Sequence, residues 1–230
     1  MLEHIVSVAD RSPGLAYHRP VSRYDPSTAL IVVDVQNDFA DPSGSLYVPG
    51  GEAVVPFLNA QIEAARTAGA PVFYTQDWHP PDTPHFEKDG GIWPVHCVAD
   101  TWGAELHPDL AWAGSVVRKG TRGEDGYSGF TTRDPQSGET TPTELDALLR
   151  DAGAKRVVIA GLATDYCVLA TGLDARGREY PTTVLASGVR AVDLADGDGE
   201  RAIAELRLAG AFVVDDATDT GDAAAPRSGH

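Results

Sequence analysis

The segment Ala29-Leu-Ile-Val-Val-Asp34 decides the fold, because five consecutive apolar residues run without alternation into a carboxylate. A strand buried on one face alternates apolar and polar residues, whereas a strand buried on both faces is apolar throughout. Strands of the second kind occur in parallel sheets that helices cover on both sides. The segment therefore predicts a buried strand of a parallel sheet, with Asp34 at its carboxyl end.

Further apolar runs alternate with helical patterns on the carboxyl side of this segment. Short apolar runs predict strands at 71–75, 115–119, 156–160, 182–186 and 211–214. Apolar residues at helical spacing predict helices at 52–67, 143–150, 164–178 and 199–208. Such alternation builds βαβ units. The sequence thus predicts an α/β fold: a single-domain three-layer sandwich with a mostly parallel six-stranded sheet and helices on both faces.

The length of 230 residues suits one domain. We expect residues 1–26 to form an irregular N-terminal extension, residues 27–216 the domain, and residues 217–230 a flexible tail, since both ends lack a sustained period. There is no internal repeat and no linker that would divide the domain.

The net charge of −16 argues against partners that carry phosphate, both nucleic acid and anionic membranes. No apolar run approaches the roughly 20 residues that a transmembrane helix needs, and the first residues do not resemble a secretory signal. Two cysteines cannot build a disulfide scaffold. We therefore expect a cytoplasmic protein without a nucleic-acid or membrane partner, and the sequence leaves open whether it forms a homo-oligomer.

Ligands of parallel sheets bind at the carboxyl ends of the strands, and a thiol lies at one of these ends. Cys167 stands in Gly161-Leu-Ala-Thr-Asp-Tyr-Cys167, between a predicted strand and the first turn of a helix. Unpaired N–H groups at a helix start activate a thiol and can hold an oxyanion. The competing interpretation is a small buried apolar residue.

Two further strand ends carry charged residues. Asp34 is either a turn residue or the general base of the thiol. Lys119 is either a solvated lysine or a charge that controls the ionisation of Asp34 and Cys167 and stabilises an anionic transition state.

A histidine-rich stretch follows the strand at 71–75. Asp77 and His79 share one face of an extended chain, because they are two residues apart, and His85 and His96 follow. Three imidazoles and one carboxylate suit zinc, iron or manganese. Solvated loop histidines are the alternative.

These residues lie in motifs that resemble the nicotinamidases (pyrazinamidases) of the isochorismatase-like cysteine hydrolases. The matching segments are Val32-Val-Asp34-Val-Gln-Asn-Asp38-Phe39, Asp77-Trp-His79-Pro with His85-Phe, Trp93-Pro-Val-His96-Cys97-Val, Lys119-Gly, Tyr127-Ser-Gly-Phe130 and Gly161-Leu-Ala-Thr-Asp165-Tyr-Cys167-Val.

The resemblance implies an amidohydrolase of NAD salvage that converts nicotinamide, and also pyrazinamide, into the acid and ammonia through a thioester. Cys167 would be the nucleophile, Asp34 its base and Lys119 the third catalytic residue. The amides of Ala163 and Cys167 would form the oxyanion hole, beside a cis peptide between Leu162 and Ala163.

The resemblance also assigns the ligands of the ion and the residues of the pocket. One divalent ion, zinc before iron or manganese, would orient the substrate ring and be held by Asp77, His79, His85 and His96. The substrate ring would lie among Phe39, Trp93 and Tyr127.

Two features depart from the family pattern. The first 28 residues precede the usual start, and the stretch Arg122-Gly-Glu-Asp-Gly126 is more acidic and richer in glycine than expected, which bears on the pocket rim. Two other functions stay open at this point: an amidase for another amide or carbamoyl substrate, and a metal-binding or redox-sensing module with Cys167 as an oxidisable thiol.

Overall fold

A parallel sheet of six strands forms the centre of the computed structural model, which describes residues 24–112 and 114–215. The strand order is β3 (Ser115–Lys119), β2 (Val72–Asp77), β1 (Thr28–Val33), β6 (Arg156–Leu162), β7 (Thr182–Arg190) and β8 (Phe212–Val214). All five neighbouring pairs are parallel. The predicted α/β class is confirmed.

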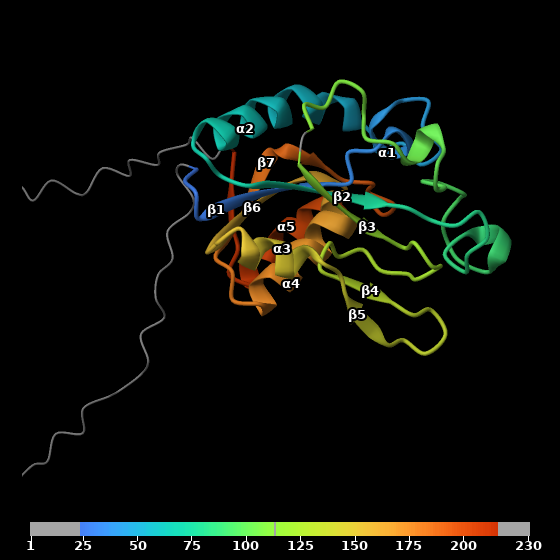
Figure 1. Cartoon of the computed structure of the whole chain (residues 1–230). Coiled ribbons are helices and arrows are strands. Elements are labelled where there is room, and N and C mark those ends of the chain that lie inside the picture. Colours follow the sequence, from blue (N-terminus) through green and yellow to red (C-terminus); the bar gives the residue numbers. More distant parts are fainter. Residues whose placement is uncertain (1–23, 113, 216–230) are drawn as a thin grey trace, which may run out of the picture.

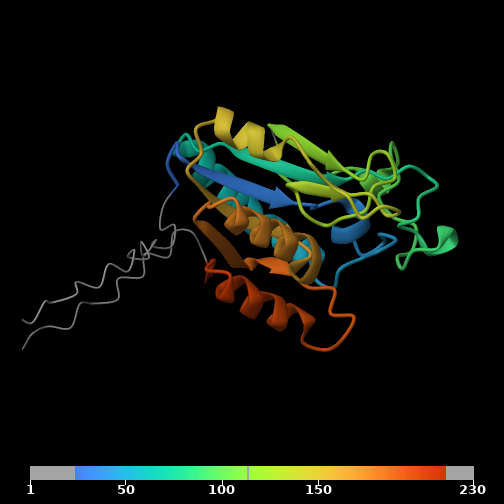
Figure 2. The ribbon, with the colours of Figure 1, turned by 90° about the horizontal axis from the view of Figure 1, so that it is seen from below.

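Helices cover both faces of the sheet, as Figure 1 shows. One face carries α2 (Val55–Thr67) and the short α1 (Asn37–Ala40). The opposite face carries α3 (Leu145–Asp151), α4 (Leu169–Gly177) and α5 (Asp198–Leu208). The helices α4 and α5 lie side by side there (Figure 2).

Alternate side chains of β1 enter the two cores. Leu30 and Val32 pack with Leu58 and Ile62 of α2, whereas Ile31 packs on the opposite side. All five are almost completely buried, and each such side chain contributes roughly 1.5–3 kcal/mol to folding. The apolar run of residues 29–33 is therefore a strand buried on both faces, as predicted.

Several short elements carry no sequence signal strong enough to predict. The antiparallel pair β4 (Thr131–Arg133) and β5 (Thr140–Pro142) lies outside the main sheet. Its strands are three residues long and rich in threonine, without the apolar alternation that marks a strand. Two short 3₁₀ segments were likewise unpredicted, η2 (Glu87–Asp89) and η3 (Trp102–Ala104), and the start of the helix predicted at 52–67 is a further 3₁₀ segment, η1 (Gly51–Val54).

The predicted helix at 164–178 is divided. Its first turn is η4 (Thr164–Val168), a π-helical turn, and α4 continues from Leu169. Wider turns of this kind often occur at functional sites, and this one carries Cys167.

The irregular extension predicted at 1–26 and the tail predicted at 217–230 lie outside the described residues, except for residues 24–26. The boundaries of the domain stay a prediction. In the described part of the chain, every helix is too short or too polar to cross a bilayer.

Candidate active site

Four adjacent strands bring their carboxyl ends to one edge of the sheet. Lys119 ends β3, Asp77 ends β2, Asp34 follows β1, and Cys167 lies in the turn after β6. Asp77 and Lys119 are also register partners of the β2–β3 pair. Residues up to 133 positions apart in the sequence (34 to 167) therefore meet because the strands are parallel and adjacent.

The Lys119 side chain is the centre of this group. Its Nζ lies 2.9 Å from Asp34 Oδ2 and 3.6 Å from Cys167 Sγ, and it donates to Asp77 Oδ1. Only 1% of Lys119 is exposed. The interpretation of Lys119 as a solvated lysine is therefore wrong.

The backbone of Asp34 lies in the left-handed region, with a φ of 48°. This conformation is uncommon for a residue with a side chain and costs on the order of 1–3 kcal/mol. Thr75 of β2 holds it in place. The Thr75 hydroxyl donates to Asp34 Oδ1 at 2.6 Å and accepts from the Asp34 N–H at 3.2 Å. Sequence reasoning missed Thr75, because a threonine inside a strand has no distinctive pattern.

Burial and charge set the protonation of the group. Burial raises the pKa of Asp34 and outweighs the opposite effect of the Lys119 charge. Burial also raises the pKa of the Cys167 thiol well above its ordinary value. A thiol that is protonated at rest, beside a carboxylate with a raised pKa, is arranged for proton transfer from sulfur to oxygen.

The two other charges are fixed. Burial lowers the pKa of Lys119, but the negative charges of Asp34 and Asp77 outweigh this effect and raise it well above the usual range. Burial would raise the pKa of Asp77, but the Lys119 charge and the neighbouring imidazoles lower it strongly. The site thus holds one permanent cation and one permanent anion around the reactive pair.

The turn that carries Cys167 begins at a cis peptide between Leu162 and Ala163, as the family resemblance implies. Ala163 is extended, and no side chain caps the N–H groups of η4. Cys167 is 5% exposed. The assignment of the Ala163 and Cys167 amides to an oxyanion hole stays a prediction.

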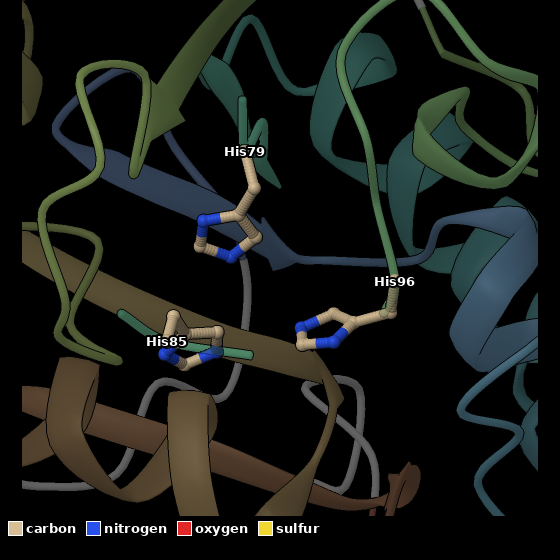
Figure 3. A group of neighbouring side chains, drawn as sticks. All are labelled: His79, His85 and His96. Atoms are coloured by element: carbon tan, nitrogen blue, oxygen red, sulfur yellow. The ribbon is translucent and has the colours of Figure 1, made fainter. Parts of the chain in front are cut away.

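Three imidazoles meet beside this group, and Figure 3 shows their rings around one common space. His79, His85 and His96 each offer a nitrogen within 4.8 Å of the others, and all three are buried. Solvated loop histidines are thereby excluded. Both ring nitrogens of His79 are buried without a hydrogen-bond partner. An unpartnered buried nitrogen facing two other imidazoles fits a divalent metal ion.

Asp77 lies between the imidazoles and the catalytic group. Its Oδ2 is 3.9 Å from His79 Nε2 and 4.0 Å from His96 Nε2, while its Oδ1 accepts from Lys119. Asp77 therefore lies near two of the three imidazoles, but it groups with Asp34 and Cys167 and not with all three imidazoles. Its role as a metal ligand stays a prediction, and its contact with the lysine had no sequence pattern.

An apolar pocket opens above Cys167, and the predicted residues Phe39, Trp93 and Tyr127 all line it. Trp93 Nε1 donates to the Tyr127 hydroxyl at 3.0 Å. Sequence reasoning missed the other side chains of the lining, which are Leu46, Val48, Tyr166 and Val192. Tyr166 directly precedes Cys167 in the sequence, and the fold packs its ring edge-on against both Trp93 and Tyr127.

The charge of the pocket lining restricts what can bind. Asp77 is its one ionised side chain among the described residues, and the lining contains no lysine or arginine. Apart from Asp77 and the Cys167 thiol, the lining consists of aromatic and aliphatic side chains, which suits an uncharged aromatic group.

Comparisons with known proteins agree with this geometry. The family model described as the isochorismatase domain matches residues 28–218. The nicotinamidase of Escherichia coli (strain K12) is 36% identical over 207 residues, which cover 82% of this chain and 94% of that protein. A pyrazinamidase of Pyrococcus horikoshii, solved in complex with zinc, is 40% identical with a TM-score of 0.73 and matches 82% of this chain and 99% of that one.

A relative with another activity also matches. The ureidoacrylate amidohydrolase of Methylobacterium radiotolerans is 32% identical over 187 residues, which cover 73% of this chain and 68% of that protein. Sequence similarity alone therefore does not distinguish nicotinamide from another amide substrate.

Proposed function

Because the chain belongs to the isochorismatase family, we propose that it is a nicotinamidase, which hydrolyses nicotinamide to nicotinate and ammonia and also accepts pyrazinamide. The observation that carries the proposal is the contact of Lys119 Nζ with both Asp34 and Cys167 beneath a pocket of aromatic and aliphatic side chains. We further propose that it works in the cytoplasm, in NAD salvage.

The first half of the reaction forms a thioester. Asp34 takes the proton of the Cys167 thiol, and the sulfur attacks the carboxamide carbon. The carbonyl oxygen becomes an oxyanion, which accepts hydrogen bonds from the N–H groups of Ala163 and Cys167. The bond between carbon and nitrogen then breaks, and Asp34 returns its proton to the departing ammonia.

The second half regenerates the thiol. Asp34 takes a proton from water, the resulting hydroxide attacks the thioester carbon, and the bond between carbon and sulfur breaks. Asp34 returns this proton to the sulfur, the carboxyl group of the product loses its proton to water, and nicotinate leaves.

The metal ligands in this proposal are His79, His85, His96 and Asp77, with zinc as the expected ion. A bound divalent ion would supply a Lewis-acidic point for the ring nitrogen of the substrate. The chain itself supplies the base, the nucleophile and the hydrogen bonds to the oxyanion.

The structure favours this function over the two alternatives. A ureido or carbamoyl acid carries a carboxylate, for which the pocket lining has no cationic partner. A redox-sensing cysteine needs an exposed thiol of low pKa. Burial of Cys167 gives the opposite: a thiol that is 5% exposed and has a raised pKa.

A substrate series tests the proposed specificity. Benzamide has the shape of nicotinamide but no ring nitrogen, so its kcat/KM should be lower by at least ~10²-fold. Pyrazinamide keeps the nitrogen and should remain a substrate, whereas ureidoacrylate should release no ammonia above background. Ammonia release by the metal-loaded protein measures all four amides. Equal rates for benzamide and nicotinamide would show that the ring nitrogen is not recognised, and turnover of ureidoacrylate alone would refute the proposed substrate.

The metal ligands are tested by elemental analysis of the purified protein. We expect one divalent ion per chain and its loss in His79→Ala, since the other ligands are placed for a set that includes His79. His107→Ala is the matched control, because His107 is also buried but its ring bonds, among the described residues, only to the local N–H of Asp109. A fully active parent without metal would contradict the assignment.

A further inference from the structure

The three imidazoles differ in the hydrogen-bond partner of Nδ1. His96 Nδ1 lies 2.7 Å from the backbone oxygen of Pro94, two residues away. His85 Nδ1 lies 2.8 Å from Asp125 Oδ1, forty residues away in the sequence. Neither acceptor can donate a proton, so each ring donates from Nδ1, and the neutral form of each ring has its lone pair on Nε2. An imidazole needs this tautomer to bind a metal through Nε2.

The Asp125 carboxylate has a fixed position. Its backbone pairs with Arg133 of β4 through two hydrogen bonds, and each of them measures 2.7 Å. The N–H of Gly126 donates to the same Oδ1 at 2.8 Å. The bonds to β4 and to Gly126 thereby hold one carboxylate oxygen of Asp125 next to His85.

A second contact joins the same two segments. The Thr83 hydroxyl lies 3.4 Å from the Gly123 oxygen, and the N–H of His85 lies 3.3 Å from that hydroxyl. The stretch from Arg122 to Gly126, which departs from the family pattern in sequence, thus contacts the segment that carries one of the proposed ligands.

We propose that Asp125 is a positioning residue of the metal site: it fixes the tautomer and orientation of His85 and makes Nε2 a stronger donor. This inference rests on the proposed metal site and adds a residue that no sequence motif indicated. Partners of metal-binding histidines affect metal affinity by about 10- to 100-fold, which makes the role measurable.

Zinc affinity is the first test, measured on metal-stripped protein by competition with a chromophoric chelator. Asp125→Ala should weaken zinc binding by about 10- to 100-fold. Asp125→Asn should weaken it less, because an amide oxygen still accepts a hydrogen bond but carries no charge. Glu124→Gln is the matched control: it removes a neighbouring carboxylate that pairs only with Arg122, and its affinity should stay within about twofold of the parent.

The tautomer of His85 is the second test, read from ¹⁵N chemical shifts of the imidazoles in the metal-free protein. The parent should show a protonated Nδ1 and an unprotonated Nε2 at His85. Asp125→Asn keeps the size of the side chain and the backbone pairing, so its His85 should still prefer the tautomer with hydrogen on Nδ1, but less strongly than in the parent. A mixture of tautomers in the parent would overturn the proposal.

The outcomes separate this inference from the proposed function. Zinc binding by Asp125→Ala as tight as in the parent would overturn the inference alone, and so would a lower Tm of the stripped variant with an unchanged zinc Kd. A parent that binds no zinc would instead refute the metal site itself, and the inference with it.

Discussion

Replacement of Cys167 by alanine is expected to lower kcat for nicotinamide by at least ~10⁴-fold, because no other side chain in the pocket can replace the nucleophile. The change removes one sulfur from a buried turn and leaves the contact between Lys119 and Asp34 in place. The fold and the pocket should therefore survive. Ammonia release gives kcat, and calorimetric titration with nicotinate gives a Kd that should stay within about tenfold of the parent.

Cys97→Ala is the matched control for this variant. Cys97 is the second cysteine, completely buried, and its Sγ lies 3.8 Å from the Gly103 oxygen. Its replacement removes the same atom from the core but none from the catalytic group, so kcat should change little while the Tm falls. Turnover by Cys167→Ala within tenfold of the parent would refute the nucleophile assignment.

Replacement of Asp34 by asparagine is expected to lower kcat by ~10³-fold or more, because the amide cannot take the proton of the thiol. The asparagine has nearly the same shape, and its oxygen can still accept from Thr75. Lys119 keeps Asp77 as its partner. The loss should appear in kcat, with the Kd for nicotinate almost unchanged.

Two further variants check that this loss is specific to the reaction. Asp174→Asn alters a carboxylate that accepts from Ser128 and Thr131, outside the catalytic group, and should keep kcat within about tenfold. Lys119→Ala combined with Asp34→Asn should cost less than the product of the single losses, since the groups act as a unit. Near-parental kcat in Asp34→Asn would show that another group is the base.

Residues with a strong local signal were predicted from the sequence. The apolar run before Asp34 indicated a strand buried on both faces, and its carboxyl end placed Asp34 at the ligand edge. The same reasoning brought Lys119 and Cys167 to that edge. A strand or helix with a buried face places apolar residues at a regular spacing, and this spacing is visible in the sequence.

Features that depend on contacts between distant segments could not be predicted. Thr75 supports Asp34 because β1 and β2 are neighbours, and a threonine is equally common in strands without such a role. The strands β4 and β5 are short and polar and show no apolar alternation, so the sequence did not predict them. For the same reason it did not predict that Asp125, which pairs with β4, contacts His85. Tyr166 directly precedes Cys167 in the sequence, but only the fold shows that its ring reaches the pocket.

The most direct test of the central claim is to detect the nicotinoyl group bound to Cys167 during turnover. Metal-loaded protein is mixed with nicotinamide, quenched in acid at successive times and digested, and the peptides are analysed by mass spectrometry. The mechanism predicts a nicotinoyl thioester on the peptide that contains Cys167, formed with the first release of ammonia and absent from Cys167→Ala. Release of ammonia while the Cys167 peptide stays unmodified at every time, or a nicotinoyl group on another residue, would contradict it.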